Sequence, residues 1–336
     1  MNHFFKRRTL LLGGAAGLAQ AVLGGCSRKG PPTIGLMLDN MSIERWLRDR
    51  DYFVEAAKKI GVEVAVKWAN GDENGQVKQF LELVDRKVDA IVVLPLNGKL
   101  FKDAVAKAKA ASIKVVAYDR IIFDADIDAY ISVDNAEIGR MQVNSVIKAA
   151  PKGNYFLLGG ANTDGNALVY REEHLKALQP LVDKGDVKIV GMEWVTDWDP
   201  AVASDIMIQV FEKHLQIDAV VASNDGTAGG VIEVLKTRAL AGKVPVSGQD
   251  CDLDACKRVL KGTQTMTVYK HLKDLATLAA DTTLALVSGK EVKYEGQLPN
   301  GFKKVDTKLL KPTLITKENM DLLVKEGMYT REQLGI

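Results

Sequence analysis

Residues 88–93 have the sequence VDAIVV, and residues 217–222 have the sequence IDAVVA. Each stretch is followed by a polar turn, a helical pattern and a further apolar strand that ends in aspartate, at Asp119 and at Asp250. We interpret the two stretches as copies of one α/β unit, which predicts two similar domains side by side. Two ordinary strand–helix–strand units could also converge on this pattern.

Apolar segments of strand length alternate with segments of helical spacing along the rest of the chain. The expected strands are 33–38, 62–66, 90–94, 114–118, 154–158, 187–194, 218–222, 244–247 and 265–269. The expected helices are 43–60, 76–86, 100–111, 135–149, 167–181, 200–214, 227–240, 252–261 and 271–288. Continuous apolar strands with helices between them predict an α/β fold of two doubly wound parallel-sheet, Rossmann-like domains.

The composition excludes several classes of protein. Of 336 residues, 47% are hydrophobic and 26% are charged, which is typical of a folded globular chain rather than a disordered one. The 45 basic and 43 acidic residues nearly balance, so no cationic surface for nucleic acid is expected. Three cysteines are too few for a disulfide scaffold.

The first 25 residues have the pattern of an export signal. A basic cluster at residues 6–8 precedes an uncharged run at 10–23, which is too short to span a membrane. The run leads to Leu-Gly-Gly-Cys, ending at Cys26, which resembles the lipobox of bacterial lipoproteins. We expect a signal peptide over 1–25, a lipid on Cys26 and a tether over 26–32; an ordinary cleaved signal is the alternative. The paired arginines leave twin-arginine export open.

Removing the signal peptide takes away three basic residues and no acidic one. The mature chain then has 42 basic and 43 acidic residues, and neither nucleic acid nor an anionic membrane is an expected partner. Attachment to the membrane is expected through the lipid on Cys26.

Polar side chains follow almost every expected strand. Because ligands bind outside the carboxyl ends of strands in such sheets, these side chains predict one shared cleft between the domains. Carboxylates accept hydrogen bonds, Arg and Lys donate them, and amides do both, which suits hydroxyl groups. Indole rings offer flat surfaces to the C–H faces of a sugar, and the mixed charges compensate one another. The alternative for each Asp or Asn is a helix cap.

Nine segments together resemble the ribose-type periplasmic sugar-binding family of bacterial ABC importers, and look most like its xylose-binding members. The segments are 44–46, 49–51, 68–71, 117–120, 124–128, 153–156, 222–225, 247–250 and 262–270. The resemblance covers nearly all of residues 33–336. It implies these ligand contacts: Arg45, Trp46, Asp119, Arg120, Asp164, Asn166, Trp198, Asn224, Asp250 and Lys270.

The resemblance also implies a hinge of three chain segments, near residues 135, 268 and 302. The N-terminal lobe would then comprise 33–135 plus 269–302, and the C-terminal lobe 136–268 plus 303–336. A simple division near residue 150 is the alternative. The chain departs from the family at Gly165, where relatives tend to have Asn, and at 171–174, where they tend to have Arg-x-Gly. Both departures lie beside Asp164 and Asn166.

The implied function is that of the substrate-binding component of an ABC importer in the periplasm. The expected partners are a monosaccharide, a pentose and D-xylose in particular, and the permease and ATPase subunits. The chain is expected to act as a monomer without a cofactor. Closure of the hinge around the sugar would be recognised by the permease, and no bond would be broken.

Two other function classes compete with this one. A lipid-anchored sugar hydrolase or isomerase could use Asp119, Asp164 or Asp250. The effector domain of a sugar-responsive repressor would need a basic helix-turn-helix before residue 33, where the chain has an export signal instead. A sensor for a chemoreceptor or kinase stays compatible with transport.

No metal site is expected. The aspartates at 124–128 resemble the start of a calcium loop, but the sixth position is Ala129 and the twelfth is Asn135 instead of Gly and Glu. No pair of histidines has zinc spacing. Cys251 and Cys256, if both lie on one helix, have Cα atoms ~8.6 Å apart, beyond disulfide reach. We therefore expect free thiols, unless Cys251 precedes the helix.

Overall fold

The sheets of this protein are built from the short runs of Val, Ile, Leu and Ala that the sequence places between amphipathic helices. The computed structural model describes residues 30–41, 43–213 and 216–336. Within it, Pro32–Ile336 forms one compact unit. The predicted signal peptide and the lipidated Cys26 lie outside the described residues. None of the helices within the described ranges is long and apolar enough to cross a bilayer.

A seven-stranded sheet forms the core of the first domain. Its strands are β1 (Thr33–Leu38), β2 (Glu63–Trp68), β3 (Ala90–Val93), β4 (Lys114–Tyr118), β5 (Ala129–Val133), β10 (Gly296–Pro299) and β11 (Lys304–Leu310). They lie in the order β10-β11-β5-β4-β3-β1-β2. Every neighbouring pair is parallel except β10 with β11, so the strands β1 to β5 end at the same edge of the sheet.

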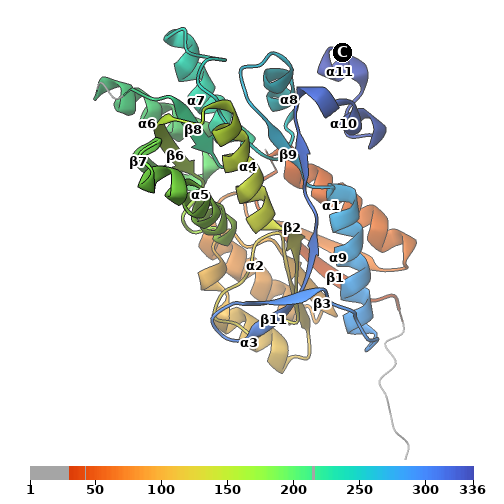
Figure 1. The fold of residues 1–336 in the computed structure, drawn as a ribbon. Helices are drawn as coiled ribbons and strands as arrows, with labels where there is room; N and C mark the ends of the chain where they lie inside the picture. The colour runs from red at the N-terminus through yellow and green to blue at the C-terminus, as the bar shows by residue number, and fades with distance from the viewer. Residues whose placement is uncertain (1–29, 42, 214–215) are drawn as a thin grey trace, which may run out of the picture. The chain divides into compact units, whose positions relative to one another are not determined.

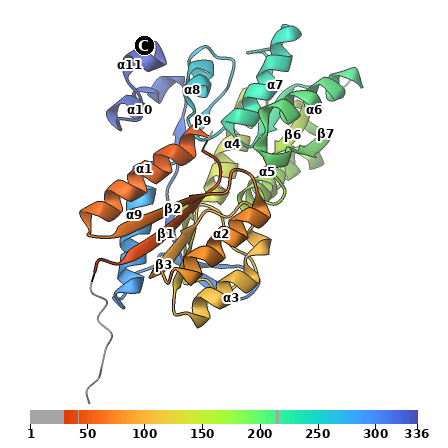
Figure 2. The ribbon, with the colours of Figure 1, turned by 180° about the vertical axis from the view of Figure 1, so that it is seen from behind.

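Helices cover both faces of this sheet, as Figures 1 and 2 show from opposite sides. On one face α1 (Glu44–Lys59) and α9 (Leu272–Val287) pack side by side over Leu36, Val92 and Val116. On the other face α2 (Glu73–Asp85) and α3 (Lys102–Ala110), preceded by the 3-10 turn η1 (Gly98–Leu100), pack over Ile91 and Val115. Each strand therefore buries side chains in two directions, which explains the continuous apolar runs.

The second domain repeats this layering around a smaller parallel sheet. Its strands β6 (Gly153–Gly159), β7 (Val187–Trp194) and β8 (Ala219–Ala222) lie in the order β7-β6-β8. Helices α4 (Asn135–Ala149) and α5 (Gly165–Asp183) cover one face. The other face is covered by α6 (Pro200–Glu212), which follows the 3-10 turn η2 (Thr196–Trp198), and by α7 (Asp225–Thr237). The α/β class with two Rossmann-like domains is thus confirmed.

The C-terminal elements form a separate packed cluster beside the second domain. Strands β9 (Thr267–Tyr269) and β12 (Thr313–Ile315) form an antiparallel pair. They pack with α8 (Leu253–Leu260), η3 (Lys317–Asn319), α10 (Asp321–Lys325) and α11 (Arg331–Leu334), and both ribbon views show α8, α10 and α11 together.

Two expected strands of the second sheet differ in the structure. Residues 244–247 form only two isolated bridges, Val246 with Val220 and Val244 with Ala241, instead of a full strand. Pro245 has no N–H to give to a ladder. The segment around 265–269 forms β9, whose partner is β12 in the antiparallel sense rather than the parallel sheet. The sequence pattern also did not predict β5, β10, β11 or β12.

The chain passes between the two domains at three places: between β5 and α4, between β9 and α9, and between β11 and β12. The third passage follows Leu310, eight residues beyond the expected position near 302. Residues 304–310 pair with β5 in the large sheet, in the register Thr307 to Tyr130. The hydrogen bonds of that pairing hold β11 in the first domain.

Candidate functional site

A pocket lies where the strands of the large sheet end and the second domain faces them. It encloses about 570 Å³, including its opening to solvent, which is in the range of small-molecule sites. Its lining contains all ten residues that the sequence analysis selected: Arg45, Trp46, Asp119, Arg120, Asp164, Asn166, Trp198, Asn224, Asp250 and Lys270. The structure therefore brings the whole predicted set together around one cavity.

The selected residues come from the ends of different elements. Arg45 and Trp46 lie in the first turn of α1, while Asp119 and Arg120 directly follow β4. Asn166 lies in the first turn of α5, and Trp198 ends η2. Asp250 lies in the loop before α8, and Lys270 in the passage from β9 to α9. Parallel strands and the N-termini of their helices share an edge, so these positions converge.

Two of the selected residues are also helix caps. Asp164 caps α5 by accepting a hydrogen bond from the Asn166 backbone N–H at 2.9 Å. Asn224 caps α7, and its Oδ1 accepts the Thr227 N–H at 2.9 Å. The cap interpretation and the pocket interpretation therefore both hold for these residues, because a helix that begins at the sheet edge places its cap at the cleft.

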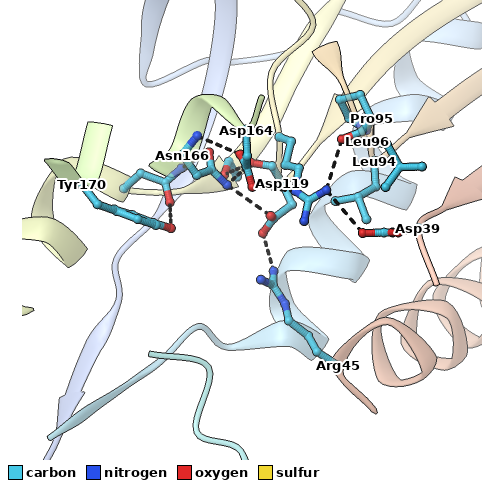
Figure 3. A network of polar contacts seen from close by, with 12 residues as sticks. Asp39, Arg45, Leu94, Pro95, Leu96, Asp119, Asp164, Asn166 and Tyr170 are labelled. Atoms are coloured by element: carbon cyan, nitrogen blue, oxygen red, sulfur yellow. Dashed lines mark hydrogen bonds and ion pairs between the residues drawn. The ribbon is translucent and has the colours of Figure 1, made fainter. Parts of the chain in front are cut away.

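Arg45 is the charge that joins the two sides of the pocket. Its guanidinium pairs with Asp119, with Asp250 Oδ1 at 3.2 Å and with Asp49 Oδ2 at 3.5 Å, and Figure 3 shows it pointing toward Asp119. Burial opposes the charge on Arg45, but the three carboxylates outweigh it and raise its pKa well above the usual value. Lys270 Nζ lies 3.0 Å from Asp250 Oδ1. Asp250 thus compensates two cations at once.

Arg120 makes a second bridge across the pocket. Its Nε lies 2.8 Å from Asp164 Oδ2, and its Nη1 lies 3.4 Å from Asp39 Oδ2. Nη1 also donates to the Pro95 carbonyl at 3.4 Å. Burial raises the pKa of both Asp39 and Asp164, although Arg120 pulls the other way.

The backbone at Asp119 has a left-handed conformation that the surrounding side chains hold in place. Its φ is 60°, which is uncommon for a residue other than glycine. The Asp119 carbonyl accepts hydrogen bonds from Tyr130 Oη at 2.8 Å, Ser132 Oγ at 2.7 Å and Asn166 Nδ2 at 3.2 Å. Burial tends to raise the pKa of the Asp119 carboxyl, but Arg45 and Lys270 lower it below its usual value. Its carboxylate is thus fixed and ionised.

Two indole rings provide the apolar surfaces of the pocket. Trp46 is 4% exposed, and the Arg45 guanidinium carbon lies 4.3 Å from its ring centroid. Trp198 lies against the backbone of Gly160, where an added Cβ would be 2.2 Å from the ring. Glycine at 160 is thus what lets the Trp198 ring approach. The indole N–H groups of Trp46 and Trp198 have no hydrogen-bond partner among the described residues.

Six lining residues were not among the ten selected: Asp39, Ile43, Tyr170, Asp197, Gln249 and Asp252. The aspartates and Gln249 follow strands, as the selected residues do, so position relative to the strands could have found them. Tyr170 lies on the buried face of α5, where its spacing is that of a core residue. Its hydroxyl donates to Asn135 Oδ1 at 2.7 Å, a partner that depends on the packing of α4 against α5.

The departure at Gly165 has a structural counterpart. A Cβ at Gly165 would lie 2.9 Å from Phe123 Cζ and 3.2 Å from Ile121 Cγ2. The Phe123 ring therefore occupies space that a side chain at 165 would need. At the second departure, Arg171 donates to the Glu193 carbonyl at 2.6 Å and lies over the Trp194 ring, and His174 is buried against Gln142. Neither Arg171 nor His174 lines the pocket.

Within the described ranges, no group of three or more His, Cys, Asp or Glu side chains is arranged to hold a metal ion. Cys251 and Cys256 are buried free thiols, and Cys256 Sγ lies 3.5 Å from the Cys251 carbonyl oxygen. Because α8 begins at Leu253, Cys251 precedes the helix, and the helical Cα distance does not apply to this pair. What the pocket does offer is a set of paired charges, amides and indoles.

Comparison with known proteins agrees with this architecture. The D-xylose-binding periplasmic protein of Escherichia coli strain K12 is 45% identical to the chain over 303 residues, which cover 90% of this chain and 92% of that protein. The D-xylose-binding periplasmic protein of Haemophilus influenzae is 42% identical over 303 residues, which cover 90% of this chain and 91% of that protein. A solved ABC transporter solute-binding protein from Clostridium phytofermentans with bound β-D-glucose has a TM-score of 0.83 and 26% identity, covering 90% of this chain and 99% of that one. Residues 34–291 match the family model described as a periplasmic binding protein domain. Because the family model and these relatives match most of the chain, and the chain has two Rossmann-like domains around a polar pocket, it belongs to the periplasmic binding protein family.

Proposed function

We propose that this chain is the substrate-binding component of an ABC sugar importer and that it binds a monosaccharide in the pocket around Arg45. The proposed ligand is a pentose, D-xylose in particular. The two relatives at 45% and 42% identity, which are named for D-xylose, support this choice. A multiple sugar-binding periplasmic receptor of Rhizobium radiobacter, 30% identical over 325 residues, supports sugars more broadly.

The observation that carries the proposal is the charge pairing inside the pocket. Each of the three cations, Arg45, Arg120 and Lys270, has at least one carboxylate partner within 3.2 Å. A neutral ligand therefore needs to supply no counter-charge. Because the ion pairs hold donors and acceptors in fixed positions, hydroxyl groups can bond to both sides of a pair. The indoles of Trp46 and Trp198 suit the C–H faces of a sugar ring.

The proposed mechanism is closure of the two domains around the sugar. Arg45, Asp119 and Arg120 belong to the large-sheet domain, and Asp164 and Asn166 to the second domain. A sugar that bonds to both sets stabilises the closed arrangement by its differential affinity for it. The permease and ATPase subunits would recognise the closed form. The three chain passages between the domains form the proposed hinge.

The chain is a binding protein rather than an enzyme, as are the relatives and the structural neighbour reported above. The carboxylates of the pocket are accordingly assigned to hydrogen bonding. We further propose that the mature chain is periplasmic, monomeric and anchored through a lipid on Cys26, which the sequence pattern before that cysteine supports.

The test is calorimetry of the chain from residue 26 onward, with Cys26→Ser, against xylose, ribose, arabinose, glucose and galactose. We expect saturable binding that is tightest for D-xylose, with the sugar recovered unchanged. Tighter binding of another monosaccharide would retain the importer role and reject the pentose assignment. Turnover of any sugar, or no binding of any, would overturn the proposal.

A further inference from the structure

Gln249 is a buried amide in the pocket wall whose side-chain oxygen has no partner among the described residues. Its side chain lines the pocket and is only 2% exposed. Its Oε1 has no hydrogen-bond partner among the described residues. A buried acceptor without a donor carries a free-energy cost, so such atoms in native proteins mark a place where a partner belongs.

The loop that carries Gln249 is held rigidly on both sides. The Gln249 carbonyl accepts the Asp225 N–H at 3.0 Å. The Asp225 carboxylate accepts the Asp252 N–H at 3.0 Å, Gln264 Nε2 at 2.7 Å and Thr267 Oγ1 at 2.7 Å. With its backbone fixed through Asp225, the loop cannot readily turn Gln249 toward a different protein donor.

Several polar groups that line the pocket with Gln249 donate to other partners. The Tyr170 hydroxyl gives its proton to Asn135 Oδ1 at 2.7 Å, so it does not donate to Gln249 Oε1. The Asp250 backbone N–H donates to the Val268 carbonyl at 3.0 Å. The cations Arg45 and Lys270, which line the same pocket, both pair with the Asp250 carboxylate. None of these groups donates to Gln249 Oε1, which leaves this acceptor available to a ligand in the pocket.

We propose that Gln249 is a ligand-contact residue whose Oε1 accepts a hydrogen bond from one hydroxyl group of the bound sugar. This inference rests on the proposed function and adds a specificity rule to it. A ligand with a hydroxyl at that position satisfies the amide, whereas a ligand with a hydrogen, an ether oxygen or a carboxylate there leaves Oε1 without a donor. The site therefore rejects the deoxy or oxidised analogue at one position of the sugar.

The test is a thermodynamic cycle between the residue and the ligand. Gln249→Met keeps the length of the side chain and removes the acceptor. Calorimetry compares this variant and the wild-type protein with D-xylose and with its monodeoxy analogues, each lacking one hydroxyl. We expect Gln249→Met to weaken D-xylose binding roughly tenfold or more. For the one analogue that lacks the bonded hydroxyl, we expect the variant and the wild type to have the same affinity.

The matched control is Gln79→Met. Gln79 also has an unpartnered Oε1 and donates through Nε2, to the Trp68 carbonyl at 2.9 Å, but it does not line the pocket. We expect its variant to bind D-xylose as the wild type does. Thermal unfolding of both variants verifies that they are folded.

Two results would overturn the inference while leaving the proposed function intact. One is unchanged D-xylose affinity in folded Gln249→Met. The other is the same loss of affinity for D-xylose and for every analogue, which would make Gln249 a positioning residue without a ligand contact. Absence of sugar binding by the wild-type protein would reject the proposed function itself.

Discussion

Arg45 Nη1 and Asp250 Oδ1 lie 3.2 Å apart although 205 residues separate them in the chain. Arg45 is on the first helix of the large-sheet domain, and Asp250 is in the loop before α8, so the pair spans the pocket. Asp250 also compensates Lys270, whose side chain is only 3% exposed. The carboxylate of Asp250 is therefore the point where two cations and both sides of the site meet.

Asp250→Asn is expected to weaken both sugar binding and folding. The substitution keeps the size of the side chain but leaves Lys270 buried without its carboxylate, and removing one partner of a buried pair costs about 3 kcal/mol. We expect sugar affinity to fall at least about tenfold. Calorimetry and urea unfolding measure the two effects.

The control is Asp186→Asn, because Asp186 also pairs with two lysines, Lys152 at 2.8 Å and Lys184 at 2.9 Å, but lies outside the pocket. Its affinity for sugar should be that of the wild type. Equal affinities for wild type and Asp250→Asn would show that Asp250 is no part of the ligand site.

Gly160→Ala is expected to disturb the site through Trp198. A Cβ at 160 would lie 2.2 Å from the Trp198 ring, so the indole must move away from the pocket. We expect roughly tenfold weaker sugar binding, as for a lost stacking or hydrogen-bonding partner, with the fold retained. Gly296→Ala is the control, since its Cβ would lie at an ordinary 3.6 Å from Thr307 Oγ1. Wild-type affinity in Gly160→Ala would exclude Trp198 from the ligand surface.

Asp49 is expected to make stability fall as the pH rises. It is buried behind Arg45 and accepts a hydrogen bond from Tyr118 Oη. Burial raises the pKa of Asp49 from 3.8 to about 6. Between these values the native state holds a proton that the unfolded chain has lost, so the free energy of unfolding decreases as pH rises through this window, by up to roughly 3 kcal/mol.

Asp49→Asn should remove this dependence. Relative to the wild type, the variant should gain free energy of unfolding as the pH rises from about 4 to about 6. Urea unfolding across that window measures the difference, and Asp51→Asn, an exposed carboxylate on the same helix, is the control. A constant difference between Asp49→Asn and wild type at every pH would refute the prediction.

His174 is expected to change stability with pH in the opposite direction, so that stability rises as the pH rises. Burial lowers its pKa from 6.5 to about 3, and its Nε2 lies 2.9 Å from Gln142 Oε1. As the pH falls below 6.5, the unfolded chain takes up a proton that the native state does not, so stability is lost on acidification toward pH 3. In His174→Gln we expect the free energy of unfolding to depend less on pH between 6.5 and 4. A slope identical to that of the wild type would contradict this.

Much of the candidate site was predictable from where residues stand relative to strands. Asp119 and Arg120 follow β4, and Asp164 and Asn224 precede helices at the sheet edge. Parallel strands bring such positions to one edge of the sheet, whatever their distance along the chain. The strand assignment and the resemblance together were therefore enough to select ten residues that line one pocket. That they contact a sugar stays a prediction.

The remaining lining residues could not be selected in this way. Tyr170 has the helical spacing of a core residue, and only the packing of α4 beside α5 gives its hydroxyl a partner in Asn135. Gln249 stands beside Asp250 in the sequence, but the lack of a protein donor at its Oε1 depends on where Tyr170, Lys270 and Arg45 lie.

The sequence by itself determined the repeated α/β unit, the layering and the edge where polar residues gather, because apolar periodicity and helix caps are local properties of the chain. Only the tertiary structure decided that β11 joins β5, that β9 pairs with β12, and that Arg45 meets Asp250. Strand register and ion pairing depend on the distances between segments that lie from 44 residues apart, as Tyr269 and Thr313 do, to 205 residues apart, as Arg45 and Asp250 do. Local patterns contain no information about those distances.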